Sequence, residues 1–180
     1  MPFLEIRRHA ERTDRADETS ALSPAGRAMC QRLVREVGPF ALVVSSPLHR
    51  AKETAQLVAG RLDAVEPDLL PDLGGATGER MFGAMARLAD WAALLDAEPK
   101  AREFADSQLA AWARIASRVQ RSDRVLAVSH GGIVDLPTVA LARRLGVPID
   151  GAALGYCEGI AVQYDGPRPT RLTFLRVPAS

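Results

Sequence analysis

The stretch IRRHAERTD (residues 6–14) continues an alternating apolar segment that begins at Phe3. The alternation over residues 3–6 predicts a β-strand, so Arg8 and His9 are expected where that strand stops. Ligands bind at the carboxyl ends of the strands in α/β sheets. This short stretch therefore predicts both the first strand of a sheet and a functional edge of that sheet.

Composition limits the classes of protein that fit. At 180 residues the chain is long enough for one domain with a real core. Its 23 Lys and Arg against 22 Asp and Glu give a net charge of +1, which favours neither nucleic acid nor a membrane surface as partner. No apolar run reaches the length of a membrane span, and the N-terminus has no signal-peptide pattern.

The two cysteines lie far apart in the sequence and form no C-x-x-C pair. Cys30 falls on the apolar side of a helical pattern, and we expect both Cys30 and Cys157 to be free thiols in a reducing compartment. The sequence also lacks a P-loop and any spacing typical of a metal site. We therefore expect a cytoplasmic protein without a metal or other cofactor.

The rest of the chain alternates helix and strand signals. Ser23-Pro24 and Ser46-Pro47 each combine a helix cap with a first-turn proline, and Gly38-Pro39 ends the first of these helices. The apolar runs ALVVSS (residues 41–46) and RVLAVS (residues 124–129) are typical of buried strands. Also expected are a helix over residues 104–119 and a terminal hairpin or two edge strands from residues 158–164 and 171–177. This rhythm predicts an α/β sandwich with a largely parallel sheet.

Three predicted strand ends carry unusual side chains. The first ends in Arg8-His9, the second leads through Ser45-Ser46-Pro47 to His49-Arg50, and a later one ends in Ser129-His130-Gly131-Gly132. Parallel strands deliver their carboxyl ends to one edge, so we expect these groups to converge on a single pocket.

Such a pocket suits a phosphoryl group. Arginine presents paired donors to phosphate oxygens, and helix N-termini offer free N–H groups and the positive end of a dipole. A neutral imidazole can attack phosphorus as a nucleophile, while a second histidine donates to the phosphoryl oxygens as charge develops.

Three motifs together resemble the histidine phosphatase superfamily, also called phosphoglycerate mutase-like. They are Arg8-His9 with Glu11 and Thr13 nearby, SSPLHRAKETA (residues 45–55) and VSHGGIV (residues 128–134). The resemblance implies a three-layer α/β/α sandwich in which His9 becomes phosphohistidine. It also implies that Arg8, Arg50 and His130 complete the phosphate pocket, with Gly131 at the helix start contacting substrate.

The chain departs from the family pattern at three places. Ala10 stands where the family usually has glycine, and Pro137 lies inside the helix expected after Gly132, where it should kink that helix or delay its start. The family's acidic proton donor follows the third strand; here LLPDLGGATGE (residues 69–79) offers Asp72, which we favour, and Glu79 as a rival that would also lie near substrate.

Several residues carry a simpler interpretation. His49 is expected to be solvated, because the family motif requires only the arginine after it. Arg7 and Arg12 either flank the pocket entrance or are ordinary surface arginines. Trp91 and Trp112 are expected to pack in or near the core.

The function expected from this set is hydrolysis of a small phosphomonoester through a phosphohistidine. A single domain over residues 1–180 leaves only about residues 74–103 for a cap, which favours a phosphatase over a phosphoglycerate mutase. A phosphate-binding or phosphoprotein-binding module without turnover is the non-enzymatic alternative. The sequence identifies neither the physiological substrate nor the oligomeric state.

Overall fold

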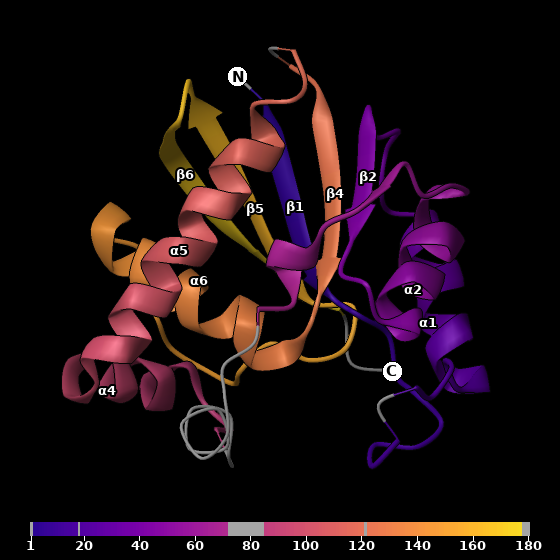
Figure 1. Ribbon diagram of the computed structural model, residues 1–180, viewed down its shortest axis with the longest axis horizontal. Helices are drawn as coiled ribbons and strands as arrows, with labels where there is room; N and C mark the ends of the chain where they lie inside the picture. Colours follow the sequence, from indigo (N-terminus) through magenta and orange to yellow (C-terminus); the bar gives the residue numbers. More distant parts are fainter. Residues whose placement is uncertain (1, 18, 72–84, 121, 178–180) are drawn as a thin grey trace.

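The computed structural model describes residues 2–17, 19–71, 85–120 and 122–177 (Figure 1). Its described strands form one six-stranded sheet in the order β3-β2-β4-β1-β5-β6. The strands are β1 (Phe3–Arg8), β2 (Leu42–Ser45), β3 (Ala64–Val65), β4 (Arg124–Ser129), β5 (Gly159–Asp165) and β6 (Arg168–Leu175). The pairings from β3 through β1 are parallel, whereas β5 and β6 add antiparallel pairs. The predicted, mostly parallel sheet is confirmed. Of the two alternatives for the last two strands, the hairpin is the one that the structure has.

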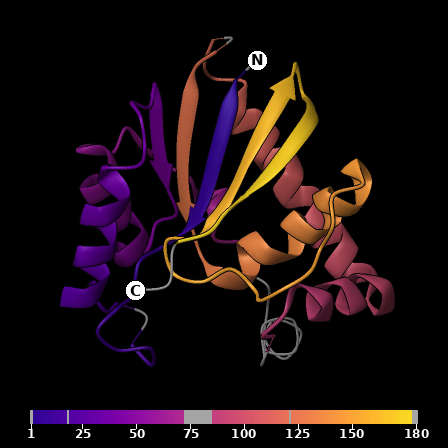
Figure 2. The same cartoon turned by 180° about the vertical axis from the view of Figure 1, so that it is seen from behind.

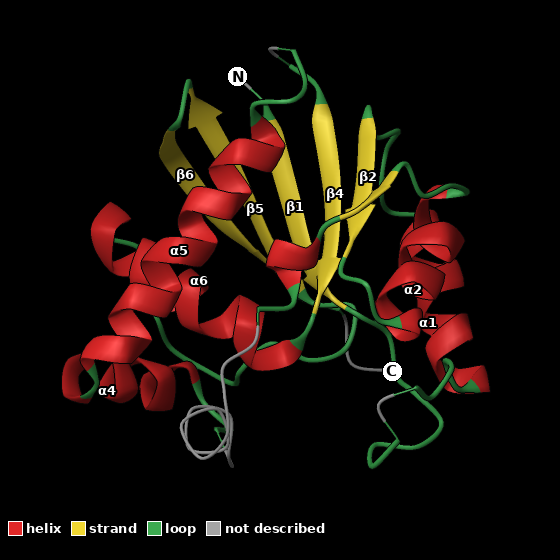
Figure 3. Cartoon of the chain, in the orientation of Figure 1, coloured by secondary structure: helices red, strands yellow, loops and turns green. Residues whose placement is uncertain are grey.

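Helices cover both faces of the sheet (Figures 1 and 2). They are α1 (Pro24–Val34), α2 (His49–Ala59), α4 (Leu88–Ala97), α5 (Pro99–Ala116) and α6 (Gly131–Leu145), with a 3-10 turn at Pro67–Leu69. Figure 3 shows α1 and α2 on one side of the strands and α4, α5 and α6 on the other. The α/β/α sandwich expected from the sequence is therefore confirmed.

The core consists of one apolar layer on each face of the sheet. The layer under α4, α5 and α6 includes Trp91 and Trp112, which are 3% and 0% exposed, so the expectation of core packing is confirmed. The layer under α1 and α2 contains Cys30 and Cys157, both buried free thiols.

The strand register brings the three motif-bearing ends together. Arg8 lies opposite Ser129 in the β1–β4 pair, and Ser45 lies opposite Val128 in the β2–β4 pair. The pairing continues one residue past the strands, because His9 N–H donates to Ser129 O (2.9 Å) and Ser46 N–H donates to Val128 O (2.9 Å).

Helix starts follow the capping signals in one case and not in the other. Ser23 caps α1 by accepting from Gly26 N–H, and Pro24 is the first helical residue, although α1 ends at Val34, short of Gly38-Pro39. The similar interpretation of Ser46-Pro47 was wrong. Helix α2 starts at His49, and the residue at its capping position is Leu48, whose side chain makes no cap. Ser46 does not cap the helix either, because its hydroxyl is hydrogen-bonded to His130.

Pro137 lies inside α6, but the start of that helix is not delayed. The helix begins at Gly131 and continues to Leu145. Pro137 is its seventh residue, so the hydrogen bond that proline cannot donate is the one to Ile133 O, well past the first turn. The first-turn N–H groups next to His130 are therefore unaffected.

The segment proposed as a cap, residues 74–103, includes α4 and the first residues of α5. Asp72 and Glu79 lie outside the described residues. Within the part that is described, no helix combines the length and apolar character needed to cross a membrane.

Candidate active site

Four predicted residues meet at the carboxyl edge of the sheet. Arg8 ends β1, His9 follows it, Arg50 lies in the first turn of α2, and His130 immediately precedes α6. The rings of His9 and His130 are 5.2 Å apart between centroids, and Arg50 Nε lies 3.2 Å from His9 Nε2. The convergence expected from the strand ends is therefore present in the structure.

His9 is held as a neutral imidazole. Burial lowers its pKa to about 3, and the charges of Arg50 and Arg8 add to this effect. Its Nδ1 lies 2.7 Å from Ala10 O, a distance at which an N–H must donate to the carbonyl. This tautomer leaves the lone pair on Nε2, where Arg50 Nε donates to it. His9 Nε2 thus has the electronic state of a nucleophile.

Ala10 fits the site without disturbing it. Its methyl group is fully buried in the layer under α1 and α2, and its carbonyl makes the contact to His9 that any residue would make. Its N–H donates to Thr54 Oγ1 (3.0 Å), and Thr54 Oγ1 donates to Arg50 O (2.8 Å). Thr54 thereby ties the backbone beside His9 to the helix that carries Arg50.

His130 is also neutral, and one of its nitrogens is unused. Burial lowers the pKa of His130 to about 2, with His9 and Arg50 as further causes. Its Nε2 and Ser46 Oγ share a hydrogen bond of 2.6 Å. Its buried Nδ1 has no hydrogen-bond partner among the described residues. A phosphoryl oxygen bound beside His9 is a suitable partner for this nitrogen.

The Arg8 guanidinium is fixed on three sides. Its Nη1 donates to Leu154 O (2.9 Å), and its Cζ lies 4.5 Å from the ring centre of Tyr156. A Cβ built on Gly131 would come within 3.3 Å of Cζ, so glycine there lets α6 approach the arginine closely. Burial lowers the pKa of Arg8, and its buried Nε has no partner among the described residues.

The N-terminus of α6 adds backbone donors. His130 occupies the capping position, yet no described side chain caps the helix. The first-turn N–H groups, beginning at Gly131, are the ones that a helix leaves without internal partners. Together with Arg8, Arg50 and His130 they form a site suited to a tetrahedral dianion.

Other candidates from the sequence lie elsewhere. Arg7 points away from the pocket into a buried ion pair with Glu5 (3.1 Å) and donates to Cys157 O (2.8 Å), so neither interpretation offered for it was right. The sequence did hold a signal for this ion pair. Glu5 and Arg7 are two residues apart on a strand, so their side chains lie on the same face of the sheet. Arg12 donates to the carbonyls of Asp17 and Arg15. His49 is exposed beside Glu53, as expected.

Sequence reasoning missed several residues that shape the site. Thr54 lies one helical turn after Arg50, a spacing that could have revealed it. Ser46 was interpreted as a cap. Tyr156 stacks on Arg8 with its ring centre 5.7 Å from that of His9, and Asp135 lies one turn after Gly131. No local motif marks Tyr156, whose position depends on the loop before β5.

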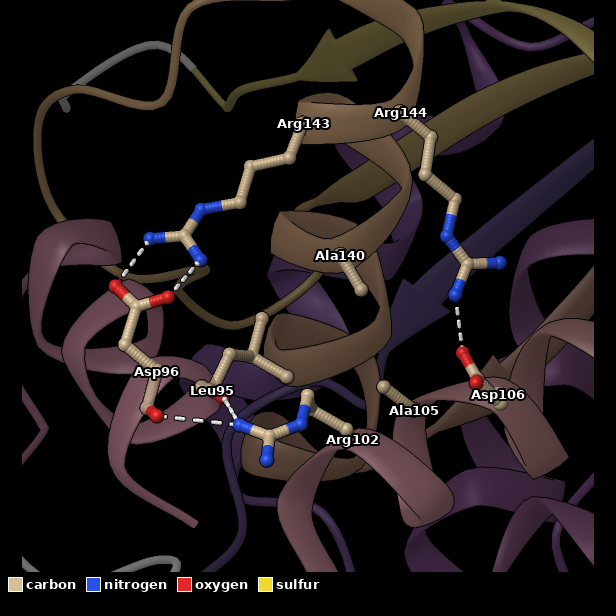
Figure 4. A pocket seen from close by; sticks show the side chains of 8 residues that line it. All are labelled: Leu95, Asp96, Arg102, Ala105, Asp106, Ala140, Arg143 and Arg144. Atoms are coloured by element: carbon tan, nitrogen blue, oxygen red, sulfur yellow. Dashed lines mark hydrogen bonds and ion pairs between the residues drawn. The ribbon is translucent and has the colours of Figure 1, made fainter. Parts of the chain in front are cut away.

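A separate hollow between α4, α5 and α6 does not belong to this site (Figure 4). Its three arginines are already paired. Arg143 and Arg144 bond the carboxylates of Asp96 and Asp106, and Arg102 donates to the carbonyls of Leu95 and Asp96. Across the described ranges, no group of three His, Cys, Asp or Glu residues is arranged to hold a metal ion.

Comparisons with known proteins concern the family and the fold of the chain. Residues 5–173 match the model of the histidine phosphatase superfamily (branch 1). A phosphoserine phosphatase from Entamoeba histolytica has a similar structure, with a TM-score of 0.69, 19% identity and 98% of each chain covered. An alpha-ribazole phosphatase from Shigella flexneri gives a TM-score of 0.59 at 23% identity over 99% of this chain and 96% of the other.

A phosphoglycerate mutase from Bacillus anthracis str. Sterne gives a TM-score of 0.61 at 18% identity, covering 97% of this chain and 92% of the other. None of the curated protein sequences matches the chain. These structures establish the fold, and the family match establishes the class. The chain belongs to the histidine phosphatase superfamily, as the three sequence motifs predicted.

Proposed function

We propose that the protein is a phosphomonoesterase that works through a phosphohistidine formed on His9. The observation that supports this most directly is the state of His9. It is a buried, neutral imidazole with its Nε2 lone pair turned toward Arg50, inside a ring of donors that fits a phosphoryl group.

The reaction follows from these positions. His9 Nε2 attacks phosphorus, a P–N bond forms, the bond from phosphorus to the alcohol oxygen breaks, and the alcohol leaves after taking a proton. Water then attacks the phosphohistidine, giving up a proton and breaking the P–N bond, so that inorganic phosphate and neutral His9 are restored. Arg8, Arg50 and His130 stabilise the charge on the phosphoryl oxygens in both steps.

The proton for the alcohol needs a carboxylic acid near the leaving oxygen. We propose Asp72 for this role and Glu79 as the rival, on the strength of their place in the sequence after the third strand.

We further propose a small phosphorylated metabolite as substrate. Similar structures include a phosphoserine phosphatase and an alpha-ribazole phosphatase, and also a phosphoglycerate mutase. The site needs no metal or other cofactor for the reaction described. The free thiols of Cys30 and Cys157 are compatible with the cytoplasmic location that we propose.

The test is phosphate release from para-nitrophenyl phosphate and from a panel of phosphorylated metabolites, with a chelator present. We expect turnover by the unmodified protein and by His49→Ala, and none by His9→Ala. His49 is an exposed histidine outside the site, so it controls for loss of an imidazole as such. Absence of turnover with every substrate would favour the binding-module alternative. Conversion of 3-phosphoglycerate to 2-phosphoglycerate faster than its hydrolysis would favour a mutase.

A further inference from the structure

A cleft of about 380 Å³ adjoins the phosphate pocket. It is lined by Arg8, Met85, Trp91, Gly131, Gly132 and Asp135, among others. Arg8 and Gly131 line both this cleft and the phosphate pocket, so the cleft begins where the phosphoryl group would be bound. The alcohol part of a phosphomonoester extends away from the phosphoryl group and needs such a space.

Among the described residues that line the cleft, Asp135 is the acidic one. Its side chain is fixed, because Oδ1 accepts from Leu154 N–H (2.7 Å), and the carbonyl of the same residue, Leu154, accepts from Arg8. No described residue donates a hydrogen bond to its other oxygen, Oδ2. The residue is 2% exposed, yet it lines the cleft. A buried carboxylate with one oxygen unpaired gains from a ligand that donates to it.

The spacing between the two anchors limits the size of the ligand. Asp135 follows Gly131 by four residues on α6, so the two lie on the same face, about 6 Å apart along the axis. A phosphoryl group at the Gly131 N–H and a cation at Asp135 are thus separated by roughly the length of a two-carbon amino alcohol.

We propose that Asp135 is a specificity-determining residue that binds the ammonium group of a short phosphorylated amino alcohol in this cleft. An ammonium supplies the donors that Oδ2 lacks and balances the carboxylate charge, while Arg8 is engaged with the phosphoryl group. Burial raises the pKa of Asp135 to about 7, with Glu158 as a smaller cause, whereas Leu154 N–H and the charges of Arg8 and Arg176 act to lower it. A further cation bound in the cleft also favours the ionised form. This inference rests on the phosphatase function proposed above.

The test compares O-phosphoethanolamine with n-propyl phosphate, in which a methyl group replaces the ammonium. At about pH 8, above the pKa of Asp135, we expect kcat/KM of the unmodified protein to be at least about tenfold higher for the amine. Asp135→Asn retains an oxygen for Leu154 N–H but has no charge, and we expect it to reduce this ratio to about one. Asp150→Asn removes an exposed charge elsewhere and should keep the ratio.

An active protein would overturn the inference by either of two results. The first is an equal kcat/KM of the unmodified protein for O-phosphoethanolamine and n-propyl phosphate. This result overturns the inference even if Asp135→Asn fails to fold. The second is an equal loss of activity on both substrates in Asp135→Asn. This result would show that Asp135 only positions Leu154 and does not bind the ammonium group. If the unmodified protein hydrolyses para-nitrophenyl phosphate without preferring the amine, only this inference fails; if it hydrolyses no phosphomonoester, the proposed function fails with it.

Discussion

At the scale of single residues, the account depends on a phosphoryl group meeting several donors at once. Arg50 donates directly to the proposed nucleophile, with Nε 3.2 Å from His9 Nε2, and it is 5% exposed. A donor in such a dry site stabilises developing charge far more than one in water does.

We therefore expect Arg50→Ala to lower kcat/KM for para-nitrophenyl phosphate by about 10²–10³, the order seen when one oxyanion donor is removed. The matched control is Arg168→Ala, which removes an exposed arginine at the start of β6. Steady-state kinetics of both variants measure the effect. A loss below tenfold in Arg50→Ala would place this arginine outside the phosphate pocket.

The proton donor is tested through the leaving group. Para-nitrophenolate leaves without much protonation, whereas an alkoxide needs a proton. Asp72→Asn should therefore slow hydrolysis of an alkyl phosphate far more than that of para-nitrophenyl phosphate. Parallel kinetics of Glu79→Gln provide the comparison. Equal slowing on both substrates, or a larger leaving-group dependence in Glu79→Gln, would remove Asp72 from this role.

At the scale of elements, the loop after β1 is held by a close contact with α1. A Cβ added to Gly26 would come within 2.1 Å of Glu11 O, a backbone atom that cannot move alone. Ser23, the cap of the same helix, also donates to the Glu11 carboxylate (2.8 Å). Helix α1 thus supports the segment that leads directly out of the active site.

Gly26→Ala should lower the free energy of unfolding by about 1–3 kcal/mol, the usual cost of overpacking, because the loop or the helix must shift. Since Glu11 is two residues from His9, activity should fall as well. Chemical denaturation and phosphatase assays are the measurements, with Ala28→Ser on the exposed side of α1 as control. Unchanged stability and activity in Gly26→Ala would show that this contact does not hold the loop.

The elements also explain how far the sequence could predict the site. Arg8, His9 and His130 lie at or next to strand ends, and Arg50 lies in the first turn of the helix that follows β2, so parallel pairing brings them together. Asp135 and Tyr156 could not be found this way. Their neighbours are set by how α6 and the loop before β5 pack around Arg8, which is tertiary packing and leaves no local pattern.

Helix boundaries show the same division. The Ser23 cap could be predicted because all its partners are local, as Gly26 N–H is three residues away. The hydroxyl of Ser46 looked identical in sequence but is bonded to His130, 84 residues away. Local propensity cannot distinguish these two serines, because the competing partner of Ser46 lies after β4, far away in the sequence.

At the scale of the whole molecule, three buried titratable groups make stability depend on pH. His9 and His130 have pKa values lowered from 6.5 to about 3 and about 2, whereas the pKa of Asp135 is raised from 3.8 to about 7. Between about pH 6.5 and 4, the unfolded chain protonates both histidines but the folded protein does not. Stability therefore falls as the pH is lowered, by about 1.4 kcal/mol per pH unit for each histidine.

Asp135 acts in the opposite direction. Its raised pKa gives a contribution that is fully present below about pH 4 and is lost as the pH rises to about 7. The two histidines together outweigh this one carboxyl. As the pH is lowered, the free energy of unfolding therefore falls by a net amount of roughly 1.4 kcal/mol per pH unit. In Asp135→Asn this slope should be steeper, and the variant should gain stability relative to the unmodified protein as the pH rises from 4 to 7.

Chemical denaturation at about pH 4.5, 5.5, 6.5 and 7.5 in phosphate-free buffer measures the free energy of unfolding as a function of pH. The unmodified protein and Asp135→Asn each give one such curve. Phosphate must be left out because a ligand of the folded state would raise its stability. Parallel curves for the two proteins would contradict the buried, proton-binding state of Asp135.

The central claim is that His9 carries the phosphoryl group during turnover. Its most direct test is to mix the protein with a radiolabelled phosphomonoester, quench within the first turnover and locate the label by peptide mass spectrometry. We predict one acid-labile, alkali-stable phosphoryl group on His9, labelled also in His49→Ala and absent in His9→Ala. A His9→Ala protein that folds and still turns over at the full rate, or a label found on another residue, would contradict the account.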